Sequence, residues 1–180
     1  MITKSASIYL LNSGVLVQPD SKTTAGVWLA SKPYSLIPSV NDHYALGQSV
    51  VVALGHSLND IPHPTSGKGL SADRLQAAKV RSEREFMEQA ELVTVELTTN
   101  GYTIMSYTNG GSKGASKGFS PTQAKAVSLN ADCNSDALGS AIADAFSHCK
   151  SNLTTQSSGT SAGTLDSNPA SQASAPYFGC

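Results

Sequence analysis

The side chains best suited to chemistry do not converge on a reaction centre in this sequence. The four histidines are His43, His56, His63 and His148, and two of them are expected at the ends of helices, where the helix dipole favours a cation. The three cysteines, Cys133, Cys149 and Cys180, show neither C-x-x-C spacing nor a histidine at a zinc-finger offset. We therefore expect no metal site and free thiols in a reducing compartment, although a disulfide between two of them stays open.

Serines and acids do not form a catalytic pattern either. The pattern G-x-S-x-G occurs within 110–118 and at 159–163, but both stretches lie in Gly/Ser-rich segments and not between a strand and a helix, as a nucleophile turn must, so no Ser–His–Asp triad can be chosen. Gly67-Lys68-Gly69 lacks the G-x-x-x-x-G-K-[ST] spacing of a phosphate loop. The glutamates between 83 and 91 lie too close together along the chain to face each other across a cleft, as a glycosidase pair must. We therefore predict a protein that is not an enzyme and needs no cofactor.

The charges are gathered by sign along the chain. Three aspartates and no base fall between Asp132 and Asp144, and three lysines and no acid fall between Gly101 and Asn130. The net charge of −1 gives no overall attraction to nucleic acid or to an acidic membrane. Patches of opposite sign favour a charged protein partner, although an ordinary mixed surface has the same composition. The largest acidic run consists of five glutamates against Arg84, namely Glu83, Glu85, Glu88, Glu91 and Glu96.

The stretch 83–119 is the unit around which the other segments are expected to assemble. Ser82 and Glu85 have the spacing of a capping box, so a short helix is expected to start there. ELVTVELTT and YTIMSYT then predict a hairpin, with Asn100-Gly101 as its two-residue turn. A Gly/Lys/Ser-rich loop at 109–119 follows. It offers an alternative function, in which a binding or regulatory module holds an anionic ligand on this loop.

The remaining elements predict a single α+β domain with a mainly antiparallel sheet and helices packed on it. The first forty residues are β-rich, with two strands around Asn12-Ser13-Gly14. Helices are expected at 43–57, from Ser71, and at 135–149, and one more strand within 123–130. Two of these helices have similar sequences, ALGQSVVVALGHS and ALGSAIADAFSHC. Their glycines, Gly47 and Gly139, indicate close approach to a neighbour, most simply the sheet.

Domain organisation follows from a change in composition near residue 150. Residues 1–150 are expected to form one folded domain, and residues 151–180 a flexible tail rich in Ser, Gly and Ala. No apolar run approaches the 18 to 20 residues that span a bilayer, and the N-terminus lacks the features of a signal peptide. We therefore expect a cytoplasmic protein.

Order and spacing of these segments resemble the immunity proteins of contact-dependent growth inhibition (CDI) systems, the CdiI family. The helix reads D-x-x-x-L-G-x-x-V-x-x-A-L-x-x-S at 42–57 and is followed by a proline-containing loop. V-x-S-x-x-x-F at 80–86, the hairpin at 91–108 and the loop closing with G-F at 109–119 come next. The resemblance covers about residues 5–150.

The resemblance implies a small cytoplasmic protein that binds the C-terminal toxin domain of the exoprotein CdiA, one to one, and blocks its active or substrate-binding site. The toxin is expected to be a nuclease, and neither nucleic acid nor a membrane is expected to bind the immunity protein directly. An acidic patch suits the basic substrate groove of a nuclease. The residues expected to contact the toxin are Glu83, Glu85, Glu88, Glu91 and Glu96, with Lys113 and Lys117 as lesser candidates.

Overall fold

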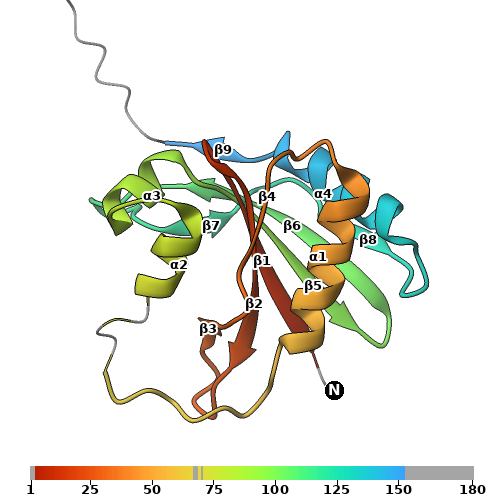
Figure 1. The fold of residues 1–180 in the computed structure, drawn as a ribbon, viewed down its shortest axis with the longest axis horizontal. Coiled ribbons are helices and arrows are strands. Elements are labelled where there is room, and N and C mark those ends of the chain that lie inside the picture. The colour runs from red at the N-terminus through yellow and green to blue at the C-terminus, as the bar shows by residue number, and fades with distance from the viewer. Residues whose placement is uncertain (1–2, 67–68, 70, 153–180) are drawn as a thin grey trace, which may run out of the picture.

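One continuous β-sheet forms the centre of the structure, a computed structural model that describes residues 3–66, 69 and 71–152 (Figure 1). The tail expected at 151–180 lies outside the described residues beyond Asn152. Along the chain the elements are β1 (Lys4–Leu11), β2 (Gly14–Lys22), β3 (Trp28–Ala30), β4 (Ser35–Ile37), α1 (His43–His56), α2 (Ala72–Ala78), α3 (Glu83–Gln89), β5 (Glu91–Thr98), β6 (Gly101–Asn109), β7 (Phe119–Pro121), β8 (Val127–Leu129), α4 (Ser135–Phe146) and β9 (Lys150–Ser151). The expected α+β fold is confirmed.

The sheet runs in the order β3-β2-β1-β5-β6-β7. β4 also pairs with β2, and β8 and β9 pair with β6. Every strand pair is antiparallel except β6 with β9. Strands from the two ends of the chain thereby meet in one sheet, because β1 lies between β2 and β5.

Both predicted hairpins form. β1 and β2 pair from Leu11↔Gly14 outward, as the Asn12-Ser13-Gly14 signal predicts. β5 and β6 pair from Thr98↔Gly101, so the two-residue loop is Thr99-Asn100 and the predicted turn at Asn100-Gly101 is one residue too late. Gly101 instead opens β6 with a φ of +108°, and a Cβ there would overlap the carbonyl oxygen of Leu129. Glycine is required at this position by contact with the next segment as well as by the turn.

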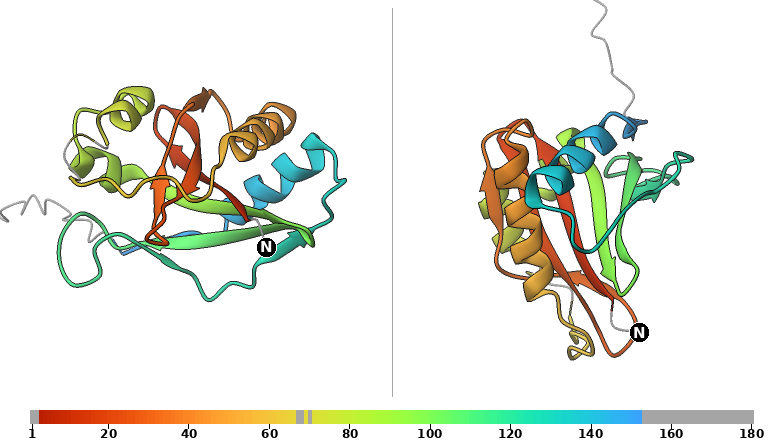
Figure 2. Two further views of the ribbon diagram at one scale, coloured as in Figure 1. Left: turned by 90° about the horizontal axis from the view of Figure 1, so that it is seen from below. Right: turned by 90° about the vertical axis from the view of Figure 1, so that its right-hand side faces the viewer.

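One face of the sheet is apolar along its whole length. Side chains alternate between faces along each strand, so alternate residues of β1, β2, β5 and β6 point the same way. On this face they are buried under α1 and α4, and Figure 2 shows these two helices on the other side of β1 and β2 from α2 and α3. The helices contribute Leu46, Val50 and Leu54 from α1 and Leu138, Ile142 and Phe146 from α4. This is the larger of the two hydrophobic cores.

The second face is apolar only in part. α2 and α3 cover one end of it, where Phe86 packs edge-on against Tyr9 with 4.9 Å between ring centroids. Leu16 and Leu92 complete this smaller core. Farther along the same face, β1 and β2 carry serines, a glutamine and an aspartate in place of apolar residues.

The two similar helices contact each other through their glycines. A Cβ at Gly47 would overlap the backbone carbonyl of Ser135, and a Cβ at Gly139 would overlap that of His43. Gln48 adds a 2.7 Å hydrogen bond from its amide nitrogen to the Ser135 hydroxyl. The expectation that these glycines approach the sheet is therefore wrong: each lets the N-terminal turn of the other helix come close.

This contact predicts that Gly47→Ala and Gly139→Ala each lower the free energy of unfolding by about 1–3 kcal/mol, the usual cost of overpacking. The better helix propensity of alanine, worth about 1 kcal/mol, offsets only part of that. Gly55→Ala is the matched control in α1, because no atom lies within 4 Å of its added Cβ, and should be neutral or stabilising. Urea unfolding of the three variants checks this, and equal effects at all three positions would contradict it.

Candidate functional site

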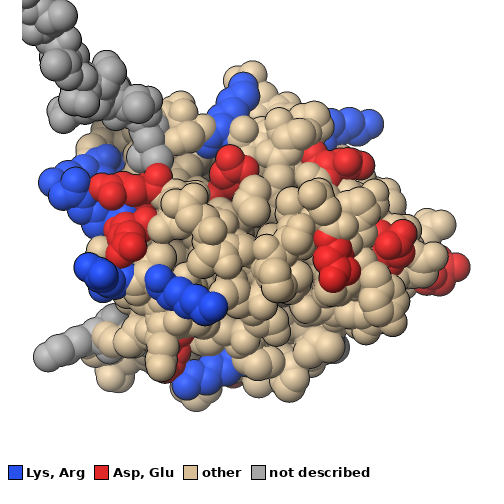
Figure 3. Space-filling view, turned by 45° about the horizontal axis from the view of Figure 1, so that its top comes forward, with Lys and Arg blue, Asp and Glu red and all other residues tan. Residues whose placement is uncertain are grey.

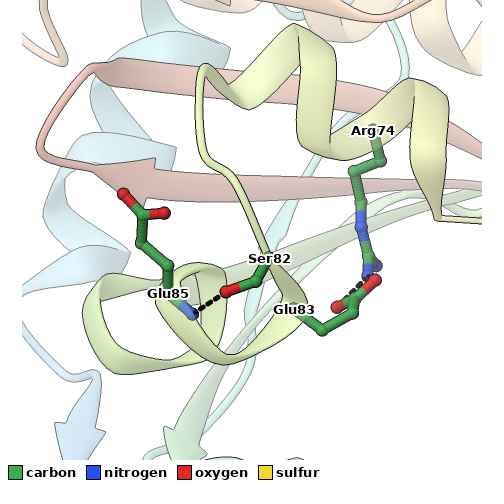
Figure 4. Close-up of polar contacts among 4 residues, drawn as sticks. All are labelled: Arg74, Ser82, Glu83 and Glu85. Carbon is green, nitrogen blue, oxygen red and sulfur yellow. Dashed lines mark hydrogen bonds and ion pairs between the residues drawn. The ribbon is translucent and has the colours of Figure 1, made fainter.

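Helix α3 carries three of the five predicted glutamates, and its first turn is capped by local hydrogen bonds. The Ser82 hydroxyl accepts a hydrogen bond from the Glu85 backbone N–H at 3.1 Å (Figure 4). The Glu85 carboxylate in turn accepts one from the backbone N–H of Arg81 at 2.8 Å. The predicted helix start is confirmed, with the return bond made to Arg81 rather than to Ser82. Two acids in the first turn also complement the positive end of the helix dipole.

The C-terminal end of α3 is tied to the sheet by one buried amide. Asn109, at the end of β6, donates two 2.7 Å hydrogen bonds from its amide nitrogen to the carbonyls of Met87 and Ala90. Its amide oxygen accepts from the backbone N–H of Gly111 at 2.7 Å. Since Asn109 is only 2% exposed, these bonds are shielded from water. The start of the loop at 109–119 is thereby held against α3.

Two of the glutamates form ion pairs with arginines. Glu83 receives two 2.8 Å hydrogen bonds from Nη2 of Arg74, on α2, and the pair joins the two helices (Figure 4). Glu88 pairs with Arg84 at 2.6 Å one helical turn away, on the exposed side of α3. Figure 3 shows acidic and basic side chains close together at the left of its view. The net negative charge of α3 is smaller than the run of glutamates indicates.

The other two glutamates of the run lie on β5, on opposite faces of the sheet. Glu96 shares the face of Leu92 and Thr94 and lines a hollow beside α2. Glu91 shares the face of Val93 and Val95, and burial raises the pKa of its carboxyl. The five predicted glutamates therefore do not form one continuous surface: three lie on α3, and two project from a strand in opposite directions.

Lys113 and Lys117 are exposed in the loop between β6 and β7. The neck of this loop is closed by backbone hydrogen bonds from Gly110 to Gly118 at 2.8 Å and from Gly118 to Gly111 at 2.9 Å. Lys117 also donates its backbone N–H, to Gly114. An anion on this loop would therefore find several of its backbone donors already engaged, and this observation weakens the anion-binding alternative.

A polar hollow of about 480 Å³ lies on the second face of the sheet, beyond the end covered by α2 and α3. Its polar wall is made by alternate residues of three neighbouring strands, which are Ser5, Ser7, Gln18, Asp20, Thr94 and Glu96. Arg74 lines it from α2 and Trp28 from β3. No side chain of this wall other than Glu96 was predicted as a site residue. The signal in the sequence was the polar Gln18 and Asp20 at alternate positions after the apolar run at 14–17.

Asp20 lines the polar hollow from β2 and is only 7% exposed. The Ser7 hydroxyl donates to its Oδ2 at 2.6 Å, and the Gln18 amide nitrogen to its Oδ1 at 3.2 Å. Burial raises the pKa of the Asp20 carboxyl, whereas hydrogen bonds from Ser7, Gln18 and Ser5 and the charge of Arg74 act to lower it. The carboxyl group thus lies in a poorly hydrated place, and each of its oxygens accepts one hydrogen bond from a neighbouring side chain.

Two polar atoms around the polar hollow have no hydrogen-bond partner among the described residues. They are Oε1 of Gln18 and Nε of Arg74, both buried. The amide orientation of Gln18 follows from chemistry, because the Asp20 carboxylate can only accept and must face the NH₂ group. Oε1 is therefore the atom left without a donor. A buried amide oxygen in this state is uncommon and favours a ligand that brings a donor.

Tyr9 closes the end of the polar hollow next to α3. Burial above all, with the nearby charge of Asp20, raises the pKa of Tyr9 to about 12, so the phenol stays protonated at neutral pH. Arg74 lies over the ring of Phe86, with 4.7 Å from its Cζ to the centroid, and Phe86 contacts Tyr9. The acidic helix and the polar hollow are therefore neighbouring parts of one surface.

The histidines, cysteines and acidic residues that the structure describes do not form a metal site. Within residues 3–66, 69 and 71–152 no three His, Cys, Asp or Glu side chains are grouped as metal ligands. Cys133 and Cys149 are free thiols whose pKa values are raised by burial, while Cys180 lies outside the described residues. None of the helices that the structure describes has the length and apolarity to cross a membrane.

A family model matches part of the chain. Residues 62–149 match the CdiI family model, described as CDI immunity protein, which confirms the resemblance over that range. No curated protein matches the chain in sequence. The matched range holds α2, α3, the β5–β6 hairpin and α4, whereas β1 and β2 precede it.

Two solved structures share the fold. One is a protein of unknown function from Neisseria meningitidis, 16% identical, with a TM-score of 0.67, covering 83% of this chain and 96% of its own. The other comes from a CdiA-CT/CdiI toxin and immunity complex of Yersinia pseudotuberculosis, 15% identical, with a TM-score of 0.65, covering 83% and 99%. A coverage of 83% exceeds the length of the range 62–149, so the shared fold extends beyond the part that the family model matches.

The raised pKa of Asp20 predicts a defined pH dependence of stability. A carboxyl whose pKa is higher in the folded than in the unfolded protein stabilises the fold at low pH, and this contribution is lost as the pH rises through the folded value. The free energy of unfolding of Asp20→Asn, relative to the parent, should therefore increase from about pH 4 upward. Urea unfolding across that range measures it, and a constant difference would contradict the assignment.

Proposed function

On the premise that this chain is related through residues 62–149 to the CdiI immunity proteins, we propose that it binds and neutralises the toxin domain of a cognate CdiA exoprotein. The match to that family is the observation that carries the proposal. The protein acts in the cytoplasm, one copy to one toxin domain, and performs no chemistry of its own.

We place the toxin on the surface formed by α3 and the polar hollow. α3 supplies three carboxylates, from Glu83, Glu85 and Glu88, on a helix held rigidly at both ends. A rigid, preformed surface loses little entropy on binding. Glu96 reaches the same surface from β5. Glu91 lies on the other face and is left out of the proposed interface.

The loop at 109–119 forms the border of this surface, because Asn109 holds its start against α3. Lys113 and Lys117 are exposed there and are proposed as secondary contacts to acidic groups of the toxin. Charges at the rim of an interface contribute more to the rate of association than to affinity. We therefore assign these lysines a role in orientation.

A nuclease is the toxin class that this surface fits best. Nucleases bind phosphates through lysines and arginines around the substrate groove. An acidic helix with carboxylates beyond it can occupy such a groove and exclude the nucleic acid by steric and electrostatic means. The arginines paired to Glu83 and Glu88 moderate the field, so most of the affinity must come from contacts within the interface.

The function is tested by producing the chain together with the cognate CdiA toxin domain. We expect protection of cells from the toxin, co-purification as a one-to-one complex, and a nanomolar or tighter dissociation constant in a titration. Cells that die despite full expression of the folded chain, or two proteins that elute separately, would contradict the proposal.

Charge removal tests the location of the interface. Glu83→Gln, Glu85→Gln and Glu88→Gln in one chain should slow association with the toxin at low salt, because steering toward a basic groove is lost. The decrease should be about tenfold or more and should diminish as salt is added. Stopped-flow association at two ionic strengths measures it.

The matched control removes three exposed carboxylates from the opposite side of the sheet. Asp132→Asn, Asp136→Asn and Asp144→Asn change the net charge by the same amount, near or on α4. Its association rate should stay within about twofold of the parent. A control that slows binding as much as the α3 variant would show that net charge alone matters and would remove the proposed interface.

A further inference from the structure

We propose that the polar hollow receives a single basic side chain, lysine or arginine, of the bound toxin domain, with the carboxylates of Asp20 and Glu96 and the amide oxygen of Gln18 as its acceptors. This inference rests on the proposed function and specifies the chemistry of the partner at one point of the surface. Three features of the polar hollow carry it: its spare acceptor capacity, its unpaired carboxylates, and its shape.

Acceptors of the polar hollow have capacity to spare. Asp20 accepts from Ser7 and Gln18, a hydrogen bond from Ser5 also acts on it, and a carboxylate has about four acceptor positions, so at least one is unused. Oε1 of Gln18, on a side chain only 2% exposed, accepts from no described residue. A lysine ammonium brings three donors and an arginine guanidinium five. Either group can satisfy Gln18 and Asp20 at once.

The two carboxylates of the polar hollow form no ion pair among the described residues. No described lysine, arginine or histidine lies within 4 Å of the carboxylate of Asp20 or of Glu96. Arg74, which lines the same wall, already gives two hydrogen bonds to Glu83. A buried carboxylate without a cation is costly, and a cation brought by a partner recovers that cost on binding. An anionic or apolar group would add to it.

The shape of the polar hollow fits a side chain that enters from a protein surface. It holds about 480 Å³, is open to solvent, and is lined by the carboxylates of Asp20 from β2 and Glu96 from β5. Arg74 keeps an unpartnered Nε–H at the wall, and a carbonyl group accompanies every side chain in a peptide. A free polyamine has no carbonyl to offer. The combination of acceptors inside and a donor at the wall therefore favours a peptide-borne cation.

The test is a calorimetric titration of the full chain with the cognate toxin domain. Asp20→Asn and Glu96→Gln each remove one carboxylate with little change of shape. Truncating one partner of a buried charge pair lowers affinity strongly, so a decrease of about 30-fold or more is expected for Asp20→Asn. Glu91→Gln is the matched control, since it makes the same change as Glu96→Gln on the same strand but on the opposite face, and should bind within about twofold of the parent.

A double-mutant cycle then identifies the base. Each lysine and arginine of the toxin domain is replaced by glutamine and titrated against the parent and against Glu96→Gln, a variant that keeps the test valid if Asp20→Asn does not fold. At one toxin position, the substitution should strongly lower the affinity of the toxin domain for the parent chain. The same substitution should lower its affinity for Glu96→Gln by little more than Glu96→Gln alone does. Putrescine is added to the free chain as a further arm, and no rise in melting temperature is expected.

The outcomes separate the inference from the proposed function. If Asp20→Asn and Glu96→Gln bind the toxin as tightly as the parent, the inference is wrong and the immunity role stands. If the parent does not bind the toxin, both are wrong. If putrescine stabilises the parent but not the Asp20→Asn chain, the occupant is a small cation and the assignment to a toxin side chain is overturned.

Discussion

Packing of α1 and α4 on one face of the sheet is the interaction on which the rest of the structure depends. The two helices meet through Gly47 and Gly139, where each backbone occupies the space that a side chain would need. This close approach lets both helices reach the sheet at once and cover its apolar face from β2 to β6. The largest fully buried side chains on that side are aliphatic, so it supplies most of the hydrophobic stabilisation.

Because one face carries the core, the other face is free to hold polar groups. α2 and α3 cover only one end of it, through Phe86, Tyr9 and Leu92. The uncovered end holds Gln18 and Asp20 in the rigid ladder of β1 and β2, where the paired strands fix their direction. The Ser57 hydroxyl adds to this by donating to the backbone carbonyl of Asp20 at 2.6 Å. The polar hollow is therefore preorganised, and its desolvation cost is offset by the stability of the opposite face.

Local signals in the sequence were sufficient for most of the elements. Ser82 caps α3 as predicted, and Asp42 and Asn134 cap α1 and α4 in the same way, each with a side-chain oxygen. Alternation and turn residues located the hairpins, although the tight loop at Thr99-Asn100 came one residue earlier than expected. These features depend on interactions within a few residues, which is why a single sequence is sufficient to predict them.

The candidate site could not be predicted in the same way, because it depends on which strands become neighbours. Glu91 and Glu96 are five residues apart on one strand and therefore point to opposite faces of the sheet. This can be predicted only if the strand is assigned without an error of even one residue. The Arg74–Glu83 pair joins two helices and reduces the charge of a run that looked uniformly acidic. The proximity of Asp20 to Glu96 requires β1 to lie between β2 and β5. Such contacts follow from tertiary structure alone.

Hydrogen–deuterium exchange of the free chain and of its complex with the cognate CdiA toxin domain tests the central claim most directly. We expect slower exchange in the complex at α3, at β3 and at the end of β2 that holds Gln18 and Asp20, with α1 and α4 unchanged. Slower exchange confined to the exposed side of α1 and α4, with α3 and β2 unchanged, would contradict it.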